Sequence, residues 1–322
     1  KFKETIDEDG YACENLEELN KWIFNSFKEL NQLKEFDIKA FNFSSYGASL
    51  VHLDENGKSF LPLYNYLKPY PAQLKEKFFA AYGGEKLVSK QTASPVLDSL
   101  NSGLQLYRLK YEKQLLDKPG YSLHLPQYLS SLITGKYYSD ITSIGCHTML
   151  WDFERNDYHD WVAKENINKR LAPLFPSDKT IKKNINGKEI AIGVRLHDSS
   201  SALIPYLSSF HQPFVLISTG TWCISLNPFN NIPLTSEELE HDCLCYLTFK
   251  RNPVKASRLF AGYEHEEQSK RIAEHFNTAT NYFETVEYNH ELANNVMDTG
   301  AKTGFRAGPS VFAKRDLSLF DN

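Results

Sequence analysis

The chain has 322 residues, of which 41% are hydrophobic and 24% charged, the composition of an ordinary soluble globular protein with about two domains. The formal net charge is −4 and no long basic run occurs, which argues against nucleic acid or an anionic membrane as the main partner. No stretch approaches the roughly 18 apolar residues of a membrane span, and the start lacks the apolar region of a signal peptide. Five cysteines without a C-x-x-C pair favour a reduced, cytoplasmic chain.

Hydrophobic residues spaced three or four apart predict an amphipathic helix over residues 14–35. Residues 37–44 and 49–53 have strand patterns, and a hairpin turn after the second predicts a partner strand at 60–63. This order of elements indicates a mixed α/β sheet. Further helices are predicted at residues 72–82, 96–116, 125–133 and 158–164.

The most informative stretch covers residues 189–226. Two apolar runs, residues 189–194 and 214–218, have the β-branched content of buried strands. Between them, His197-Asp198-Ser199 opens a helix. Beyond this stretch, the sequence predicts a capped helix at 235–240, a strand at 244–250 and a helix at 256–276.

The chemistry of this stretch suits phosphoryl transfer. Asp198 places a carboxylate near a helix N-terminus, where it could orient an attacking hydroxyl. The turn Ser218-Thr219-Gly220-Thr221 offers backbone and hydroxyl donors to phosphate oxygens. Each feature also has an ordinary explanation: Asp198 or Ser199 could simply cap the helix, and the turn could simply close a hairpin.

Four further segments give this pair its context. They are Ser45-Tyr46-Gly47 with Asp54-Glu55-Asn56-Gly57, Pro126-Gln127-Tyr128-Leu129 with Leu132-Ile133-Thr134-Gly135, Ser139-Asp140-Ile141-Thr142-Ser143, and His147-Thr148-Met149-Leu150-Trp151-Asp152. Together with His197-Asp198-Ser199 and Ser218-Thr219-Gly220-Thr221-Trp222, they resemble, in the same order, the motifs of the FGGY-family carbohydrate kinases. The sequences of the last two motifs are most similar to those of the family members that phosphorylate rhamnulose and other deoxy-ketoses.

The resemblance implies an α/β, actin-like, hexokinase-type (ribonuclease H-like) fold with two lobes, incomplete at both ends of this chain. Residues 1–210 would form the N-terminal sugar-binding lobe and residues 211–322 the start of the C-terminal nucleotide-binding lobe. The implied reaction is phosphorylation of a ketose at a primary hydroxyl, with ATP and Mg²⁺ and without a protein-bound metal. L-fuculose, L-rhamnulose and xylulose remain open as substrates, and a homodimer is common in families of this kind.

The resemblance also assigns residue roles. Asp198 would be the catalytic base. Tyr46, Gly47, His197 and Ser199 would contact the sugar, and Gly220 with Thr221 would contact the nucleotide phosphates. Trp151 and Trp222 could stack on a sugar or be structural residues.

Three departures from the family pattern occur, and the first of them keeps a second hypothesis open. The D-x-G-T phosphate loop and the adenosine site of the family are absent from this sequence, and an insertion around Cys146-His147 breaks the usual spacing, so no role is assigned to His147. The alternative to a kinase is a non-catalytic sugar sensor on the same fold.

Overall fold

The computed structural model describes residues 2–220, 222–259, 261–292 and 294. The helices are α1 (Leu16–Leu30), α2 (Ala72–Ala81), α3 (Glu85–Gln91), α4 (Ser102–Glu112), α5 (Leu125–Thr134), α6 (Ile141–Ile144), α7 (Asp160–Lys164), α8 (Asp198–Ser209), α9 (Ser236–Glu240) and α10 (Ala261–Phe276). The strands are β1 (Thr5–Ile6), β2 (Ala12–Cys13), β3 (Ala40–Phe41), β4 (Ser44–Ser45), β5 (Leu50–His52), β6 (Ser122–His124), β7 (Trp151–Asp152), β8 (Asp157–Tyr158), β9 (Thr180–Ile185), β10 (Lys188–Gly193), β11 (Leu196–His197), β12 (Leu216–Ser218), β13 (Cys223–Asn227), β14 (Cys243–Leu247) and β15 (Pro253–Leu259).

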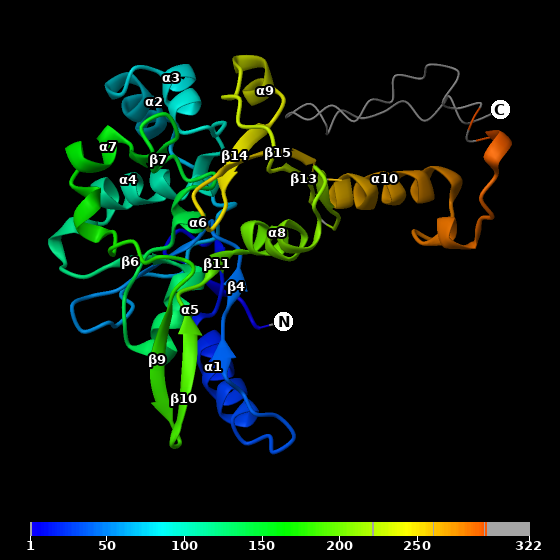
Figure 1. Ribbon diagram of the computed structural model, residues 1–322. Helices are drawn as coiled ribbons and strands as arrows, with labels where there is room; N and C mark the ends of the chain where they lie inside the picture. Colours follow the sequence, from blue (N-terminus) through cyan, green and yellow to red (C-terminus); the bar gives the residue numbers. More distant parts are fainter. Residues whose placement is uncertain (1, 221, 260, 293, 295–322) are drawn as a thin grey trace.

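Short strands from distant parts of the chain pair to form the sheets. β10 lies between β3, which is parallel to it, and β9, which is antiparallel. β11 pairs in parallel with β4, and β5 pairs antiparallel with β6. A separate antiparallel sheet follows in the order β12-β13-β15-β14. In Figure 1 the β9–β10 hairpin extends from the body of the protein beside α1, and α10 projects away from the antiparallel sheet.

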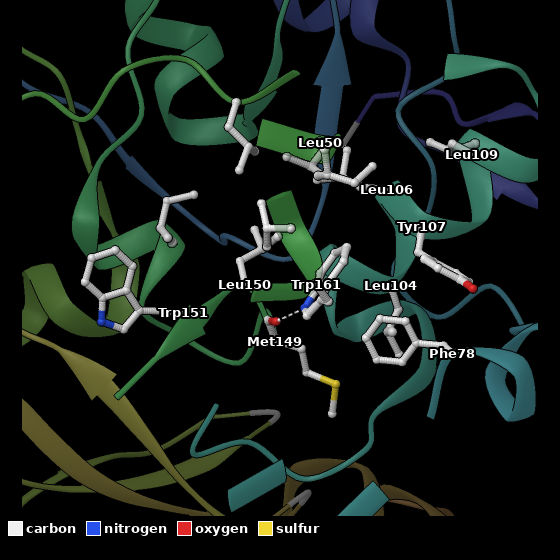
Figure 2. Close-up of a cluster of buried hydrophobic side chains, with 14 of the residues drawn as sticks. Leu50, Phe78, Leu104, Leu106, Tyr107, Leu109, Met149, Leu150, Trp151 and Trp161 are labelled. Atoms are coloured by element: carbon white, nitrogen blue, oxygen red, sulfur yellow. Dashed lines mark hydrogen bonds between the residues drawn. The ribbon is translucent and has the colours of Figure 1, made fainter. Parts of the chain in front are cut away.

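The largest hydrophobic cluster surrounds the indole of Trp161 (Figure 2). The indole Nε1–H donates to the backbone carbonyl of Met149 at 2.8 Å, so its single polar group is satisfied inside the core. Phe78 meets Trp161 edge-on, with ring centroids 5.2 Å apart. Trp151 is also fully buried in this cluster, so it is a structural residue and does not face a sugar.

Two further clusters position the elements that carry the candidate site. α1 and α5 pack with β5 and β10 through residues such as Ile23, Leu129 and Ile190. Leu203 of α8 packs with Cys146 and with the apolar face of the antiparallel sheet. α8 is therefore fixed to that sheet along its length by apolar contact.

The helices predicted at residues 14–35, 72–82, 125–133, 158–164 and 235–240 are confirmed, with small differences at their ends. The helix predicted over 96–116 is shorter, because α4 begins only at Ser102. Three expectations are wrong. The partner of β5 is β6 and not residues 60–63, residues 253–259 form a strand before α10 begins, and β12 is an edge strand whose Ile217 is exposed.

In the part of the chain that the structure describes, no helix has both the length and the apolar character needed to cross a membrane.

Among the described residues five histidines are buried, His52, His124, His147, His159 and His197, and burial lowers the pKa of each because the charged form loses its hydration. The pKa of His52 falls to about 3, and that of His124 also falls to about 3. The Nδ1 of His52 bonds to the Ser122 hydroxyl at 2.8 Å, and the Nε2 of His124 bonds to the Ser102 hydroxyl at 2.9 Å. These rings are neutral members of the core.

We expect Trp161→Phe to lower the free energy of unfolding by about 2 kcal/mol or more, because it leaves a cavity and a buried carbonyl without its donor. The matched control is Trp22→Phe, since Trp22 is 53% exposed. Urea unfolding of both variants measures the effect. Equal stability of the two variants would contradict the central place of Trp161 in the core.

We also expect the protein to lose stability as the pH falls from 6.5 to 5. A histidine with a lowered folded pKa takes up its proton only on unfolding, so stability rises with pH between the folded pKa and about 6.5. His52 and His124 together should contribute about 3 kcal/mol across this interval. The buried carboxyl of Asp140, whose pKa is raised by burial, acts in the opposite direction.

Urea unfolding at three pH values in this interval provides the measurement. His52→Gln should reduce the pH dependence, whereas the same change at the exposed His211 should leave it unaltered. A free energy of unfolding that stays constant from pH 6.5 to 5 would show that the buried rings are not neutral.

Candidate active site

The candidate site forms where β4 and β11 end side by side. These strands are parallel, with His197 opposite Ser45 and Leu196 opposite Ser44. Parallel strands end at the same edge of a sheet, where ligands bind in open α/β folds, so residues 46–47 and 198–199 emerge together. A Cβ atom added to Gly47 would lie 2.6 Å from Cδ2 of His197, which shows how closely the two segments approach.

Asp198 is the first residue of α8 and presents its carboxylate to solvent. Its Oδ1 accepts from the Ser199 amide at 2.6 Å and from the Ser199 hydroxyl at 3.3 Å. Its side chain is 51% exposed, and among the described residues it forms no ion pair with a lysine or arginine.

The expectation that Asp198 or Ser199 caps α8 is wrong. His197 occupies the cap position, and no side-chain cap bond is made there. Asp198 lies one residue inside the helix, where its carboxylate reaches only the amide of the next residue. The carboxylate therefore makes no capping hydrogen bond and remains available to a ligand.

His197 lies beneath the site as a neutral, tightly packed ring. It is 3% exposed, and burial lowers its pKa, opposed in part by the nearby charge of Asp198. Its Nε2 lies 3.4 Å from Oδ1 of Asp198. The ring stacks on Tyr246 of β14 with centroids 5.3 Å apart, and it meets His147 at 5.9 Å.

Two of the motif segments hold the backbone that leads into the site. The His197 amide donates to Oγ1 of Thr142 at 2.9 Å, and Thr142 in turn donates both its amide and its hydroxyl to Asp140. From α5, Gln127 donates to the Arg195 carbonyl and Ser130 to the Gly193 carbonyl, each at 2.9 Å. The conformation of β11 is therefore fixed from both sides by buried hydrogen bonds.

Tyr66 lies at the candidate site but was not among the residues predicted from the sequence. Its ring lies 5.7 Å from that of Tyr46. Burial raises the pKa of both hydroxyls, and the charge of Asp198 raises that of Tyr66 further. The only signal was an aromatic-rich loop at residues 64–71, which fits no motif, so its position could be found only from the tertiary structure.

The turn expected to hold nucleotide phosphates lies in the antiparallel sheet, between β12 and β13. Gly220 is exposed there, and an added Cβ would have only the Trp222 carbonyl within 4 Å, at 3.9 Å. Its backbone is thus open to a ligand. Thr221 lies outside the described residues. Trp222 is half-buried, with the Arg258 guanidinium 5.1 Å from its ring.

A hollow of about 400 Å³ lies near the supports of β11 and away from the residues predicted for the site. Ser177 in its wall donates to Asp140, which links it to the Thr142 support. Its lining residues are Ile141, Leu174, Phe175, Pro176, Ser177, Asp178, Phe249, Lys250 and Arg251. None of the expected sugar or nucleotide contacts belongs to this set.

Comparison with known proteins gives a consistent family. Residues 211–305 match the family model of the carbohydrate kinase FGGY C-terminal domain. A rhamnulokinase from Oceanobacillus iheyensis is 22% identical over 253 residues, which cover 74% of this chain and 51% of the relative.

Solved structures show the same fold. A carbohydrate kinase from Novosphingobium aromaticivorans is 22% identical, with a TM-score of 0.68 over 83% of this chain and 59% of its own. A xylulose kinase from Rhodospirillum rubrum is 13% identical, with a TM-score of 0.69 over 92% of this chain and 60% of its own. The chain thus spans a little over half the length of these relatives and has the corresponding part of their actin-like two-lobed fold. In the family match of residues 211–305, in the fold and in the ordered motifs, the chain is similar to the FGGY carbohydrate kinases.

Proposed function

We propose that this protein transfers the γ-phosphoryl group of ATP to a primary hydroxyl of a ketose, with Asp198 as the base. The observation that carries the proposal is the half-exposed carboxylate of Asp198 at the shared edge of β4 and β11, next in sequence to His197, whose ring lies against Gly47. The similar proteins named rhamnulokinase and xylulose kinase support a deoxy-ketohexose or ketopentose such as L-rhamnulose, L-fuculose or xylulose.

In this mechanism the sugar hydroxyl oxygen forms a bond to the γ-phosphorus while the bond to the ADP oxygen breaks. Asp198 accepts the hydroxyl proton. The transition state of phosphoryl transfer is loose, so the main task of Asp198 is to orient the hydroxyl. The half-exposed carboxylate is accessible for that task before the substrate binds.

The other site residues would form the sugar subsite. Gly47 allows the sugar to approach the backbone, Tyr46 offers an aromatic face, and Ser199 offers a hydroxyl beside the carboxylate. His197, neutral and held by Tyr246, supports this wall and faces Asp198 through its Nε2. Tyr66 completes the aromatic side of the subsite through its contact with Tyr46.

The nucleotide side of the proposal rests on the β12–β13 turn. The open backbone of Gly220 fits an approaching phosphate group, and Thr221 would add a hydroxyl. When bound, Mg²⁺ would neutralise phosphate charge; it is commonly held by phosphates and water, and no residue of this chain is assigned to it. Residues 1–210 would serve the sugar and residues 211–322 the nucleotide. A cytoplasmic location, with reduced thiols and ATP at hand, is part of the same proposal.

The test is a panel of ketoses with ATP and Mg²⁺, followed by Asp198→Asn on the best substrate. We expect the variant to lower kcat by about 100-fold or more with little change in sugar affinity, because general-base positioning is worth about 10²–10⁴ in rate. The matched control is Asp157→Asn, since Asp157 is also exposed and also accepts from the amide of the next residue.

Activity of Asp198→Asn within a few-fold of the unaltered protein would refute its role as base. Binding of a ketose by calorimetry without any turnover of ATP would instead support the sensor hypothesis. If the protein neither binds nor phosphorylates any ketose of the panel, ketoses are ruled out as its substrates.

We expect Gly47→Ala to weaken ketose binding, because the added methyl group would lie 2.6 Å from a ring that Tyr246 prevents from moving freely. The strain should also lower the free energy of unfolding by about 1–3 kcal/mol. Gly220→Ala is the steric control, since its methyl group would meet open space. Calorimetric titration and urea unfolding measure the two effects, and unchanged ketose binding would place the sugar away from Gly47.

A further inference from the structure

Behind the proposed sugar subsite lies a cluster of metal-ligating side chains that the kinase mechanism does not use. Cys146, His147 and His197 offer a sulfur and two imidazole nitrogens that all lie within 4.8 Å of one another. The three residues are 1%, 7% and 3% exposed, respectively. A thiolate with two imidazoles is a donor set suited to zinc.

Three ring nitrogens of this cluster lack hydrogen-bond partners among the described residues. In the described structure, neither ring nitrogen of His147 makes a hydrogen bond, and Nδ1 of His197 makes none. Burying such groups without partners costs free energy. The unpaired nitrogens of two neighbouring rings therefore indicate a bound group between them.

The histidine beside the active carboxylate is also oriented as a metal ligand requires. Nε2 of His197 faces the Asp198 carboxylate at 3.4 Å, which favours the tautomer with its proton on Nε2. That tautomer leaves a lone pair on Nδ1, which makes no hydrogen bond in the described structure and is free to bind a metal ion. A ligating histidine that donates its other N–H to a carboxylate is the usual arrangement in protein zinc sites.

The surroundings hold the donors in place. Tyr246 stacks on His197 at 5.3 Å and meets His147 edge-on at 6.0 Å. The loop of Cys146 and His147 is fixed by a hydrogen bond from Asn101 to the His147 carbonyl at 2.9 Å and by one from the Thr148 amide to the Cys146 carbonyl at 2.8 Å. A tetrahedral zinc site separates its donors by about 3.5 Å, so small rotamer changes would close the set.

We propose that Cys146, His147 and His197 bind one Zn²⁺ ion, with the fourth coordination position left to water. The Cys146 thiol, which donates to the Ser143 carbonyl at 3.1 Å, loses its proton to solvent when the Zn–S bond forms. This claim is independent of the proposed kinase activity.

The experiment titrates the metal-free chain with Zn²⁺, and separately with Co²⁺, whose spectrum reports a thiolate ligand through a sulfur-to-metal charge-transfer band. We expect one equivalent to bind and a charge-transfer band to appear. Cys146→Ser and His147→Gln should each weaken binding by about 100-fold or more, since even residues behind the ligands are worth about 10–100-fold.

The matched controls are Cys245→Ser and His124→Gln, which alter another buried thiol and another buried ring outside the cluster; both should bind Zn²⁺ as the unaltered chain does. Circular dichroism checks that each variant folds. If Cys146→Ser does not fold, the unaltered chain still decides the matter. The proposal is overturned if the chain retains no equivalent of Zn²⁺, or if its Co²⁺ complex lacks the sulfur-to-metal band. Ordered water would then be the partner of these nitrogens.

One consequence rests on the proposed function. A zinc ion on Nδ1 of His197 would make its Nε2–H a stronger donor to the Asp198 carboxylate, 3.4 Å away, and so restrain that carboxylate from turning toward a sugar hydroxyl. We expect added Zn²⁺ to slow ketose phosphorylation in the unaltered enzyme and not in Cys146→Ser. Zinc binding without any effect on turnover would leave the metal site standing and separate it from catalysis, whereas inactivity of the enzyme without zinc would count against the proposed function alone.

Discussion

The parallel pairing of β4 with β11 is the constraint on which the candidate site depends. Each strand is only two residues long, and the pair joins segments about 150 positions apart in the chain. So short a ladder contributes little by itself, because two paired residues make few hydrogen bonds, each worth about 1 kcal/mol net. Its geometry must be imposed by what surrounds it.

Buried side-chain hydrogen bonds supply that support. Thr142 accepts from the His197 amide, while Gln127 and Ser130 donate to carbonyls of the segment before it. These donors and acceptors belong to the motifs that surround Asp140 and Pro126 in the sequence. The motif residues thus act mainly on the backbone of β11, and only through it on the carboxylate of Asp198. This division explains why the motifs can lie far from the site in sequence and still determine its geometry.

The sequence allowed the long helices and the start of α8 to be predicted, because hydrophobic periodicity and turn chemistry are local signals. It failed where the outcome depends on tertiary context. The apolar run at β12 was expected to be buried but forms an exposed edge, and residues 256–259 were assigned to a helix although they belong to strand β15, whose alternate side chains are buried. For the candidate site, the motif order singled out Asp198 and Gly47, whose roles stay predictions, whereas the contact of Tyr66 with Tyr46 and the approach of His147 to His197 arise only on folding. The roles of Gly220 and Thr221 stay predictions.

The close approach of Gly47 to His197 has a consequence for how this scaffold can diversify. Position 47 has no room for even a methyl group, so it must remain glycine in any evolved variant that keeps the His197 ring in place. Discrimination among sugar stereoisomers would then evolve through neighbours that carry replaceable side chains, Tyr46, Tyr66 and Ser199. A library intended to shift substrate preference should vary those three positions and leave the glycine fixed.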